Sequence, residues 1–171
     1  AAVSVQKVPH YLSNIVLYGA MIYGVFVICK LAAAVYQYKT MTRRYSSARK
    51  RRDTKIDMLK VKYPFLPEIY VVASRESRAF SLGFVRRSIY ISSQLVEKMG
   101  DKELEAVILH EYKHVKDFDS LKLFIAFVIE TALSFIPSMK EFTISMRIDR
   151  EIEADGFAVH IQKTNTHLLS S

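Results

Sequence analysis

Residues 100–119 read GDKELEAVILHEYKHVKDFD, and the pattern of this stretch decides the fold around it. Gly100 and Asp101 open the stretch as a stop followed by an N-cap. Apolar residues then recur at helical spacing, at Leu104, Val107, Ile108, Val115 and Phe118. The sequence therefore predicts a helix with one buried apolar face.

Residues 110–114 of this helix spell His-Glu-Tyr-Lys-His, an H-E-x-x-H motif. Residues four apart share a helix face, so His110 and His114 can offer two imidazole nitrogens to one metal ion, with Glu111 beside them. The pattern is typical of zinc hydrolases, but it also arises by chance in about one in a few hundred chains of this size. A third metal ligand is needed to strengthen the prediction.

A second cluster, RIDREIEAD at 147–155, supplies that ligand. A catalytic zinc commonly takes two histidines, one glutamate and a water. Glu151 is the predicted third ligand, because Glu153 is turned about 200° from it on a helix. The alternative is an ordinary ion pair between Arg147 and Glu151 on a solvated helix face, and the upstream motif makes it the less favoured reading.

Two carboxylates are placed to hold the histidines. Asp155 follows Glu151 by one turn, and Asp119 follows His114 by five residues. Histidines that bind a metal usually donate their second ring N–H to such a group, which fixes their tautomer and orientation. Both aspartates are therefore candidate supports of the site.

Several motifs occur in a characteristic order between about Ile69 and Val159. They are FSLGF at 80–84, SIYIS at 88–92, ELEAVIL at 103–109 leading into the H-E-x-x-H, HVKDFD at 114–119 and REIEAD at 150–155. In this order they resemble the membrane-anchored gluzincin metallopeptidases. The resemblance is closest to the BlaR/MecR-like antirepressor and signal-transducer peptidases and extends to the heat-shock and CAAX-processing membrane peptidases.

The resemblance implies one Zn²⁺ per chain, a peptidase activity and a role for each matched residue. By it, His110, His114 and Glu151 bind zinc, Glu111 is the general base, and Asp119, Arg147 and Asp155 support the site. The chain departs from the family pattern at Tyr112-Lys113, where apolar and small residues are usual, and at Ala154, where the signal-transducer group often has cysteine.

Short β-branched segments at 69–73 and 89–91 are predicted strands of a small sheet that precedes the motif helix. In the related peptidases the strand near 80–84 borders the cleft and can pair with extended substrate. The resemblance makes Ser81, Leu82, Gly83 and Phe84 candidate substrate-binding residues. A purely structural strand is an equally open reading.

The chain is almost wholly apolar from Leu12 to Ile28, and the stretch continues to about Tyr36. This length is enough to cross a hydrocarbon layer of roughly 30 Å, so we predict a single transmembrane helix. A cleaved signal peptide is less favoured because the positive charges follow the stretch. Packing of this helix against the catalytic domain is the other alternative. The lone Cys29 excludes an intramolecular disulfide.

The net charge of +8 is concentrated after the apolar stretch, at Lys39, Arg43, Arg44, Arg49, Lys50, Arg51, Arg52 and Lys55. By the positive-inside rule, the catalytic part is expected in the cytosol. Contact with anionic lipid head groups explains the basic run. Nucleic acid is not an expected partner, because the run lacks interleaved aromatic residues beyond Tyr45.

A second apolar stretch, 121–136, separates the two ligand clusters. A single membrane crossing there would place His114 and Glu151 on opposite faces of the bilayer, unable to share a metal ion. The stretch is therefore predicted to be a core helix, an interfacial helix or a re-entrant pair, with Pro137 at its end.

These observations predict a mainly helical α+β domain of zincin-like metallopeptidase type, with a small sheet and an N-terminal transmembrane helix. The predicted parts are an anchor at 1–38, a basic linker at 39–62 and a zinc metallopeptidase domain at 63–171. The predicted function is hydrolysis of peptide bonds in protein or peptide substrates. A catalytically inactive membrane adaptor or sensor that keeps the fold is the main alternative, and a basic surface-binding module is the third.

Overall fold

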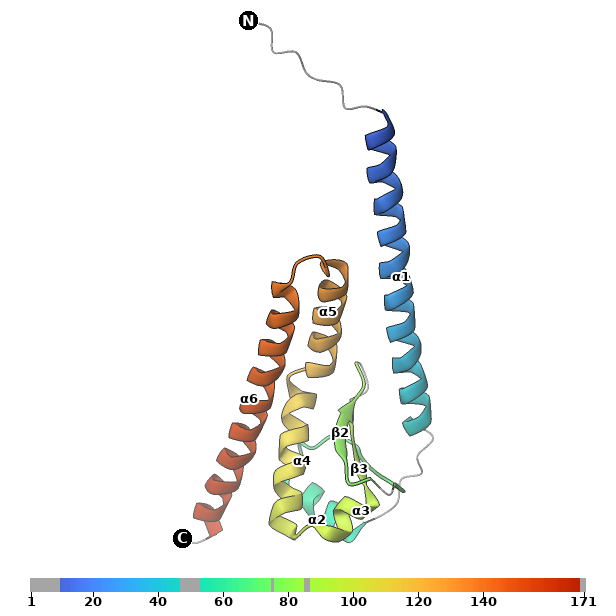
Figure 1. Cartoon of the computed structure of the whole chain (residues 1–171). Coiled ribbons are helices and arrows are strands. Elements are labelled where there is room, and N and C mark those ends of the chain that lie inside the picture. Colours follow the sequence, from blue (N-terminus) through green and yellow to red (C-terminus); the bar gives the residue numbers. More distant parts are fainter. Residues whose placement is uncertain (1–9, 47–52, 75, 85–86, 170–171) are drawn as a thin grey trace, which may run out of the picture. The chain divides into compact units, whose positions relative to one another are not determined.

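The computed structural model describes residues 10–46, 53–74, 76–84 and 87–169 (Figure 1). Internal contacts divide the chain into two units, residues 1–38 and 39–171. The elements in chain order are α1 (His10–Ser46), α2 (Thr54–Lys62), β1 (Ile69–Val72), β2 (Ala79–Leu82), β3 (Ser88–Ser92), α3 (Ser93–Lys98), α4 (Asp101–Lys116), α5 (Asp119–Ala132) and α6 (Ser138–Leu169).

Helix α1 accounts for the described part of the first unit, residues 10–38. Its segment Tyr11–Arg43 has 33 residues and a mean hydropathy of 2.1 in its most apolar window, none of which is buried. At 1.5 Å per residue the segment is about 50 Å long, more than a hydrocarbon layer requires. Large side chains such as Val16 and Ile22 are exposed along it. Length and composition therefore indicate membrane anchoring.

The second unit is built on a three-stranded sheet in the order β1-β3-β2. Strand β1 runs parallel to β3, with Tyr70 opposite Tyr90, and β2 runs antiparallel to β3, with Phe80 opposite the same Tyr90. Ile89 and Ile91 of the central strand are fully buried. Because β2 has a partner on one side only, its outer backbone edge is left for other contacts.

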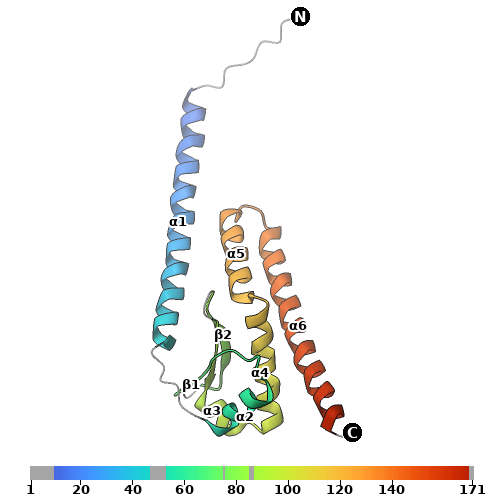
Figure 2. The same ribbon diagram turned by 180° about the vertical axis from the view of Figure 1, so that it is seen from behind.

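Helix α4 packs between this sheet and α6 (Figures 1 and 2). It begins at Asp101, one residue after its N-cap Gly100, whose N–H donates to the Glu103 carboxylate at 3.0 Å. Leu104, Ile108 and Leu109 are almost completely buried and form the centre of the core. This apolar face fixes the rotation of α4 and thereby the direction of its histidines.

Part of the predicted basic linker, 39–62, is a packed helix. Residues 54–62 form α2, which Asp53 caps by accepting the N–H of Lys55 at 2.9 Å. Ile56 and Leu59 belong to the same core as α4. This helix therefore belongs to the packed second unit.

Helices α5 and α6 run side by side as a hairpin (Figures 1 and 2). Helix α5 ends at Ala132, earlier than Pro137, where the sequence predicted the end. Pro137 instead directly precedes Ser138, the first residue of α6, a position that does not need its missing N–H. The hairpin brings the chain back toward α4, so the region 121–137 does not separate the two ligand clusters.

The observed architecture confirms the predicted fold class. It is mainly helical, contains one small sheet and carries one N-terminal helix long and apolar enough to span a membrane. Both predicted strands, at 69–73 and 89–91, correspond to β1 and β3.

Candidate metal centre

Three side chains converge between α4 and α6. His110 and His114 come from α4, and Glu151 comes from the middle of α6. One ligand atom from each lies within 4.8 Å of the others. The two Nε2 atoms are 3.1 Å apart, and the Glu151 carboxylate lies 3.5 Å from His110 Nε2 and 3.9 Å from His114 Nε2.

This spacing fits a tetrahedral zinc ion. With Zn–N bonds of about 2.0–2.1 Å, two ligand atoms of a tetrahedral site lie about 3.3 Å apart. The two imidazoles and one carboxylate are also a donor set well attested for catalytic zinc. The Glu151 side chain is 58% exposed, whereas that of His114 is 12% exposed. The site is therefore open to water on the α6 side.

Each histidine is held through its second ring nitrogen. His110 Nδ1 lies 2.8 Å from Asp155 Oδ1, and His114 Nδ1 lies 2.8 Å from Asp119 Oδ2. An Nδ1–H that donates to a carboxylate leaves Nε2 as the lone-pair donor for a metal. The aspartates thus select the tautomer in which both Nε2 atoms can act as ligands.

Arg150 contacts the site although the sequence did not single it out as a site residue. Its Nη1 donates to Asp119 Oδ1 at 3.0 Å, on the carboxylate that holds His114. Asp119 is almost fully buried, so this charged hydrogen bond is shielded from water. Arg147, the arginine named by the family resemblance, is exposed on α6. The sequence signals for Arg150 are its position next to Glu151 and its place as the first residue of the REIEAD motif.

The junction between α4 and α5 places Asp119. Phe118 adopts a left-handed backbone conformation with φ of 60°, which is rare for a residue with a bulky side chain. Arg87 lies 3.6 Å from the centre of the Phe118 ring and donates to the Val115 carbonyl at 2.7 Å. These contacts stabilise the turn, and the turn directs Asp119 back toward His114.

The departure from the family pattern at Tyr112-Lys113 has a structural role here. Lys113 Nζ donates to Asp117 Oδ2 at 2.7 Å, and this hydrogen bond raises the pKa of Lys113. Burial would raise the pKa of Asp117, but the bond and charge of Lys113 outweigh it and hold that pKa below its usual value. Tyr112 packs against Phe65, with ring centres 4.8 Å apart. Both residues therefore brace the outer side of α4.

Glu111 lies next to the ligands but in a different environment. It is 9% exposed, and burial raises the pKa of its carboxyl group above the ordinary value. His114 and His110 oppose this rise, as does a hydrogen bond that the backbone N–H of Ser81 donates to Glu111. A carboxylate with a raised pKa is well suited to accept and return a proton.

Strand β2 borders the metal centre. In the antiparallel pair with β3, the Arg78 carbonyl accepts the Ser92 N–H, so Ser81, an odd number of residues later, directs its backbone groups outward. Gly83 follows the strand with φ of 115°, a conformation that favours glycine. Ser81, Leu82, Gly83 and His114 line one small cavity together, while Phe84 packs near Phe124.

Comparison with known proteins gives the class of this chain. Residues 1–168 match the family model described as BlaR1 peptidase M56. Because the match covers nearly the whole sequence, the chain belongs to the BlaR1 peptidase M56 family. The predicted resemblance to the BlaR-like membrane metallopeptidases is thereby confirmed.

Individual relatives are similar over about half of the chain. Protease HtpX of Nitrosococcus oceani is 38% identical over 74 residues, 42% of this chain and 25% of that protein. A protease HtpX homolog of Sulfurovum is 30% identical over 87 residues, 50% of this chain and 32% of that protein. Regulatory protein BlaR1 of Staphylococcus aureus is 35% identical over 72 residues, 42% of this chain and 12% of that protein. The matched region thus spans less than a third of each relative.

Proposed function

We propose that this chain is a membrane-anchored zinc endopeptidase that hydrolyses peptide bonds in protein or peptide substrates. The observation that carries the proposal is the convergence of both Nε2 atoms and the Glu151 carboxylate, with buried Glu111 beside them. Zinc bound by these residues would polarise the substrate carbonyl and lower the pKa of water. Membership of a metallopeptidase family supports the same reaction.

The residues of the chain divide the remaining chemistry between them. Glu111 accepts a proton from the attacking water and passes it to the departing amine, which the raised pKa of its carboxyl group favours. Asp119 and Asp155 keep the two imidazoles oriented, with their Nε2 atoms free of protons. Arg150 keeps Asp119 in place.

We propose that the substrate binds as an extra strand along β2, at Ser81 to Phe84. The backbone N–H of Ser81 donates to Glu111, so a peptide paired with the outer edge of β2 would pass close to the general base. Methylating single backbone nitrogens of a substrate peptide tests this mode. Cleavage should fall sharply for alternate positions near the scissile bond, and equal cleavage of every methylated peptide would contradict it.

The decisive test of the catalytic proposal is Glu111→Gln, which keeps the size of the side chain but removes its basicity. The variant should bind zinc as the wild type does, about one ion per chain, and lose peptide cleavage by at least about 100-fold. Metal content by mass spectrometry and cleavage of a peptide library in membranes measure the two properties. Retained cleavage in Glu111→Gln would contradict the assigned base.

A catalytically inactive membrane adaptor is the second candidate. It predicts zinc binding without cleavage of any library peptide by the zinc-loaded wild type. The buried position and raised pKa of Glu111 favour the enzyme, because an adaptor has no need of a buried ionisable group beside the metal.

We further propose that the second unit lies on the cytosolic side of the membrane. The support is the run of basic residues that follows the apolar segment of α1, from Lys39 to Lys55. Protease added to sealed spheroplasts should leave the second unit intact and digest it after lysis. Digestion before lysis would show that the second unit lies on the opposite side of the membrane. Anionic lipid, rather than nucleic acid, is the partner expected for the basic run.

A further inference from the structure

The α5–α6 hairpin exposes several large apolar side chains. Between residues 122 and 147, the buried residues are small or polar, namely Ala126, Thr131 and Thr143, which are 6–8% exposed. Large residues face outward with 45–68% of their surface exposed, namely Ile125, Ile129, Phe135, Phe142 and Ile144. We call these five residues the hairpin surface. Domains that fold in water bury such residues, whereas helices packed in lipid place small residues between them and large apolar ones outside.

The residues of the hairpin surface point in different directions around the helices and do not form a single face. Phe142 and Ile144 are about 200° apart on α6, yet both are exposed. Ile125 and Ile129 extend the surface along α5, and Phe135 adds the turn between the helices. A protein groove covers one side of a helix, while hydrocarbon can cover all sides. The distribution therefore favours lipid over a protein partner.

The positions of the charged residues indicate how far the hairpin can enter a bilayer. Residues 123–146 contain Glu130, Lys140 and Glu141 as their only charged side chains. Exposed Lys122 precedes this region and exposed Arg147 follows it, at nearly equal distances along the chain from Phe135. Because α5 and α6 run side by side, these two cations lie at a similar level of the hairpin, where they can meet anionic head groups. Lys140 and Glu141, neighbours of opposite charge near the turn, are exposed within this region.

Length and tethering make a bilayer the natural partner. The 14 residues of α5 span about 21 Å, too little to cross roughly 30 Å of hydrocarbon but enough to enter one leaflet. The turn of the hairpin lies at the end of the second unit opposite α2 and α3 (Figures 1 and 2). The membrane-anchoring α1 belongs to the same chain, so the hairpin is always at high effective concentration near lipid.

We propose that the hairpin surface inserts into one leaflet of the bilayer and gives the second unit its own attachment to the membrane. Phe135 and Phe142 enter the hydrocarbon of that leaflet, and Lys122 and Arg147 contact anionic head groups. Of the three readings of region 121–137, this selects a re-entrant pair of helices. The attachment is independent of catalytic activity, so it stands or falls separately from the peptidase proposal.

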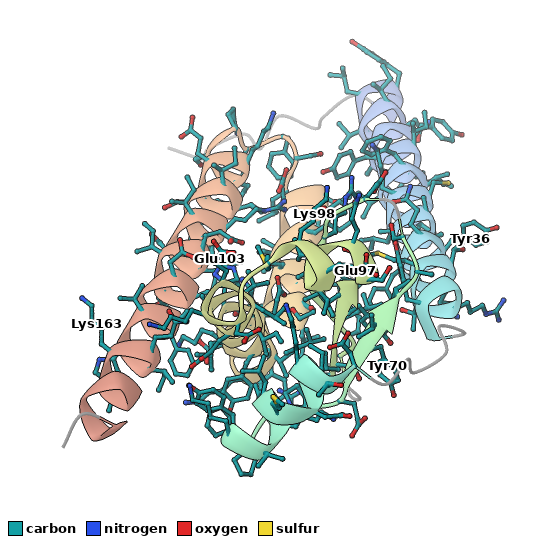
Figure 3. All side chains as sticks on the ribbon, turned by 90° about the horizontal axis from the view of Figure 1, so that it is seen from below. Tyr36, Tyr70, Glu97, Lys98, Glu103 and Lys163 are labelled. Carbon is teal, nitrogen blue, oxygen red and sulfur yellow. The ribbon has the colours of Figure 1, made fainter. Side chains whose placement is uncertain are left out.

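Site-directed spin labelling of the full chain tests the proposal. Cys29 is the lone cysteine, so Cys29→Ser gives a background into which single cysteines are introduced. The test positions are Phe135→Cys and Phe142→Cys. Val61→Cys, 83% exposed on α2, is a matched apolar control, and Lys163→Cys, whose side chain points outward from α6 in Figure 3, is a polar one. The chain is placed in vesicles of phosphatidylcholine and phosphatidylglycerol.

Accessibility of each label to oxygen, which concentrates in lipid, and to a water-soluble nickel chelate gives the outcome. The oxygen-to-nickel ratio should be several-fold higher at positions 135 and 142 than at both controls. Adding Phe142→Glu to the Phe135→Cys chain should lower the ratio at 135. Ratios equal to the controls would place the hairpin in water and overturn the proposal.

Low accessibility to both reagents would also overturn it, because the hairpin surface would then be covered by protein. Spin–spin broadening would identify a second copy as that cover, and its absence would point to another part of the chain. Zinc content of each labelled chain shows that the second unit is folded. A labelled chain that retains zinc but shows an oxygen-to-nickel ratio equal to the controls would therefore refute insertion and leave the proposal for the metal site unaffected.

Discussion

At the scale of single residues, the candidate site depends on two carboxylates, Asp119 and Asp155, that fix the orientation of the two histidines. The spacing of His110, His114 and Glu151 in the sequence was enough to name them, because helix periodicity alone puts the histidines on one face. Arg150 could not be named in the same way. Its contact with Asp119 joins residues 31 apart and exists only because the left-handed turn at Phe118 directs Asp119 toward α6.

We expect Arg150→Gln to weaken zinc binding by roughly 10-fold, within the range typical for a residue that orients a metal ligand. Loss of Arg150 leaves buried Asp119 without its cation and loosens the hold on His114. Arg147→Gln is the matched control, since Arg147 is exposed on the same helix and should change affinity by less than about 3-fold. Competitive titration with a zinc chelator measures both.

The two variants also decide between the arginines. A larger loss in Arg147→Gln than in Arg150→Gln would favour the supporting role that family resemblance assigned to Arg147. Equal cleavage per bound zinc in Arg150→Gln and the wild type would show that Arg150 acts through metal binding and not on the substrate.

At the scale of elements, local patterns predicted α4 and two strands, but not where packing ends a helix. Helix α5 ends at Ala132 and a turn follows, although apolar residues continue in the sequence to Ile136. Helix α2 lies in a segment dominated by basic residues, and its burial depends on a core formed by distant strands. Both features are set by contacts between elements.

The link between α2 and α4 gives a test of that packing. Lys62 Nζ donates to Glu105 at 2.8 Å, and Tyr63 donates its hydroxyl proton to the same carboxylate. Burial would lower the pKa of Lys62, but the hydrogen bond and charge of Glu105 outweigh it and raise that pKa above 10.5. Because the lysine is 39% exposed, we expect Lys62→Met to cost only about 1 kcal/mol of unfolding free energy after allowance for solvent screening.

The pH dependence follows from the sign of this shift. Because the pKa of Lys62 is raised in the folded state, its contribution to the free energy of unfolding is complete below the unfolded pKa of 10.5. This contribution is lost as the pH rises through the folded pKa. The difference between wild type and Lys62→Met should therefore be constant from pH 7 to about 9 and shrink above about 10.5. Urea unfolding measures it. Lys60→Met, which removes the more exposed pair with Glu68, should cost less than about 0.5 kcal/mol.

At the scale of the whole molecule, the candidate metal site joins two elements that are far apart in the sequence. Its candidate ligands come from α4 and α6, and the α5–α6 hairpin connects these two helices along the chain. The comparisons place the chain in the BlaR1 peptidase M56 family. Binding of zinc should therefore stabilise the second unit as well as prepare it for catalysis.

We expect zinc at 100 times its dissociation constant to stabilise the folded state by about 2.7 kcal/mol and raise Tm by about 5–10 °C. Chelation should reverse the rise. Differential scanning calorimetry in detergent measures the shift. An unchanged Tm, with Glu151→Gln as the control lacking one ligand, would argue against a shared metal site.

The sequence by itself determined the helix that carries H-E-x-x-H, the candidate ligands, the apolar N-terminal segment and the family resemblance. Each of these depends on periodicity, composition or motif order along the chain, which need no knowledge of distant contacts. Only the tertiary structure decided that β2 is the edge strand beside Glu111, that Arg150 contacts Asp119, and that the α5–α6 hairpin exposes its large residues. These depend on which surfaces meet when distant segments pack, and burial of that kind cannot be read from spacing alone.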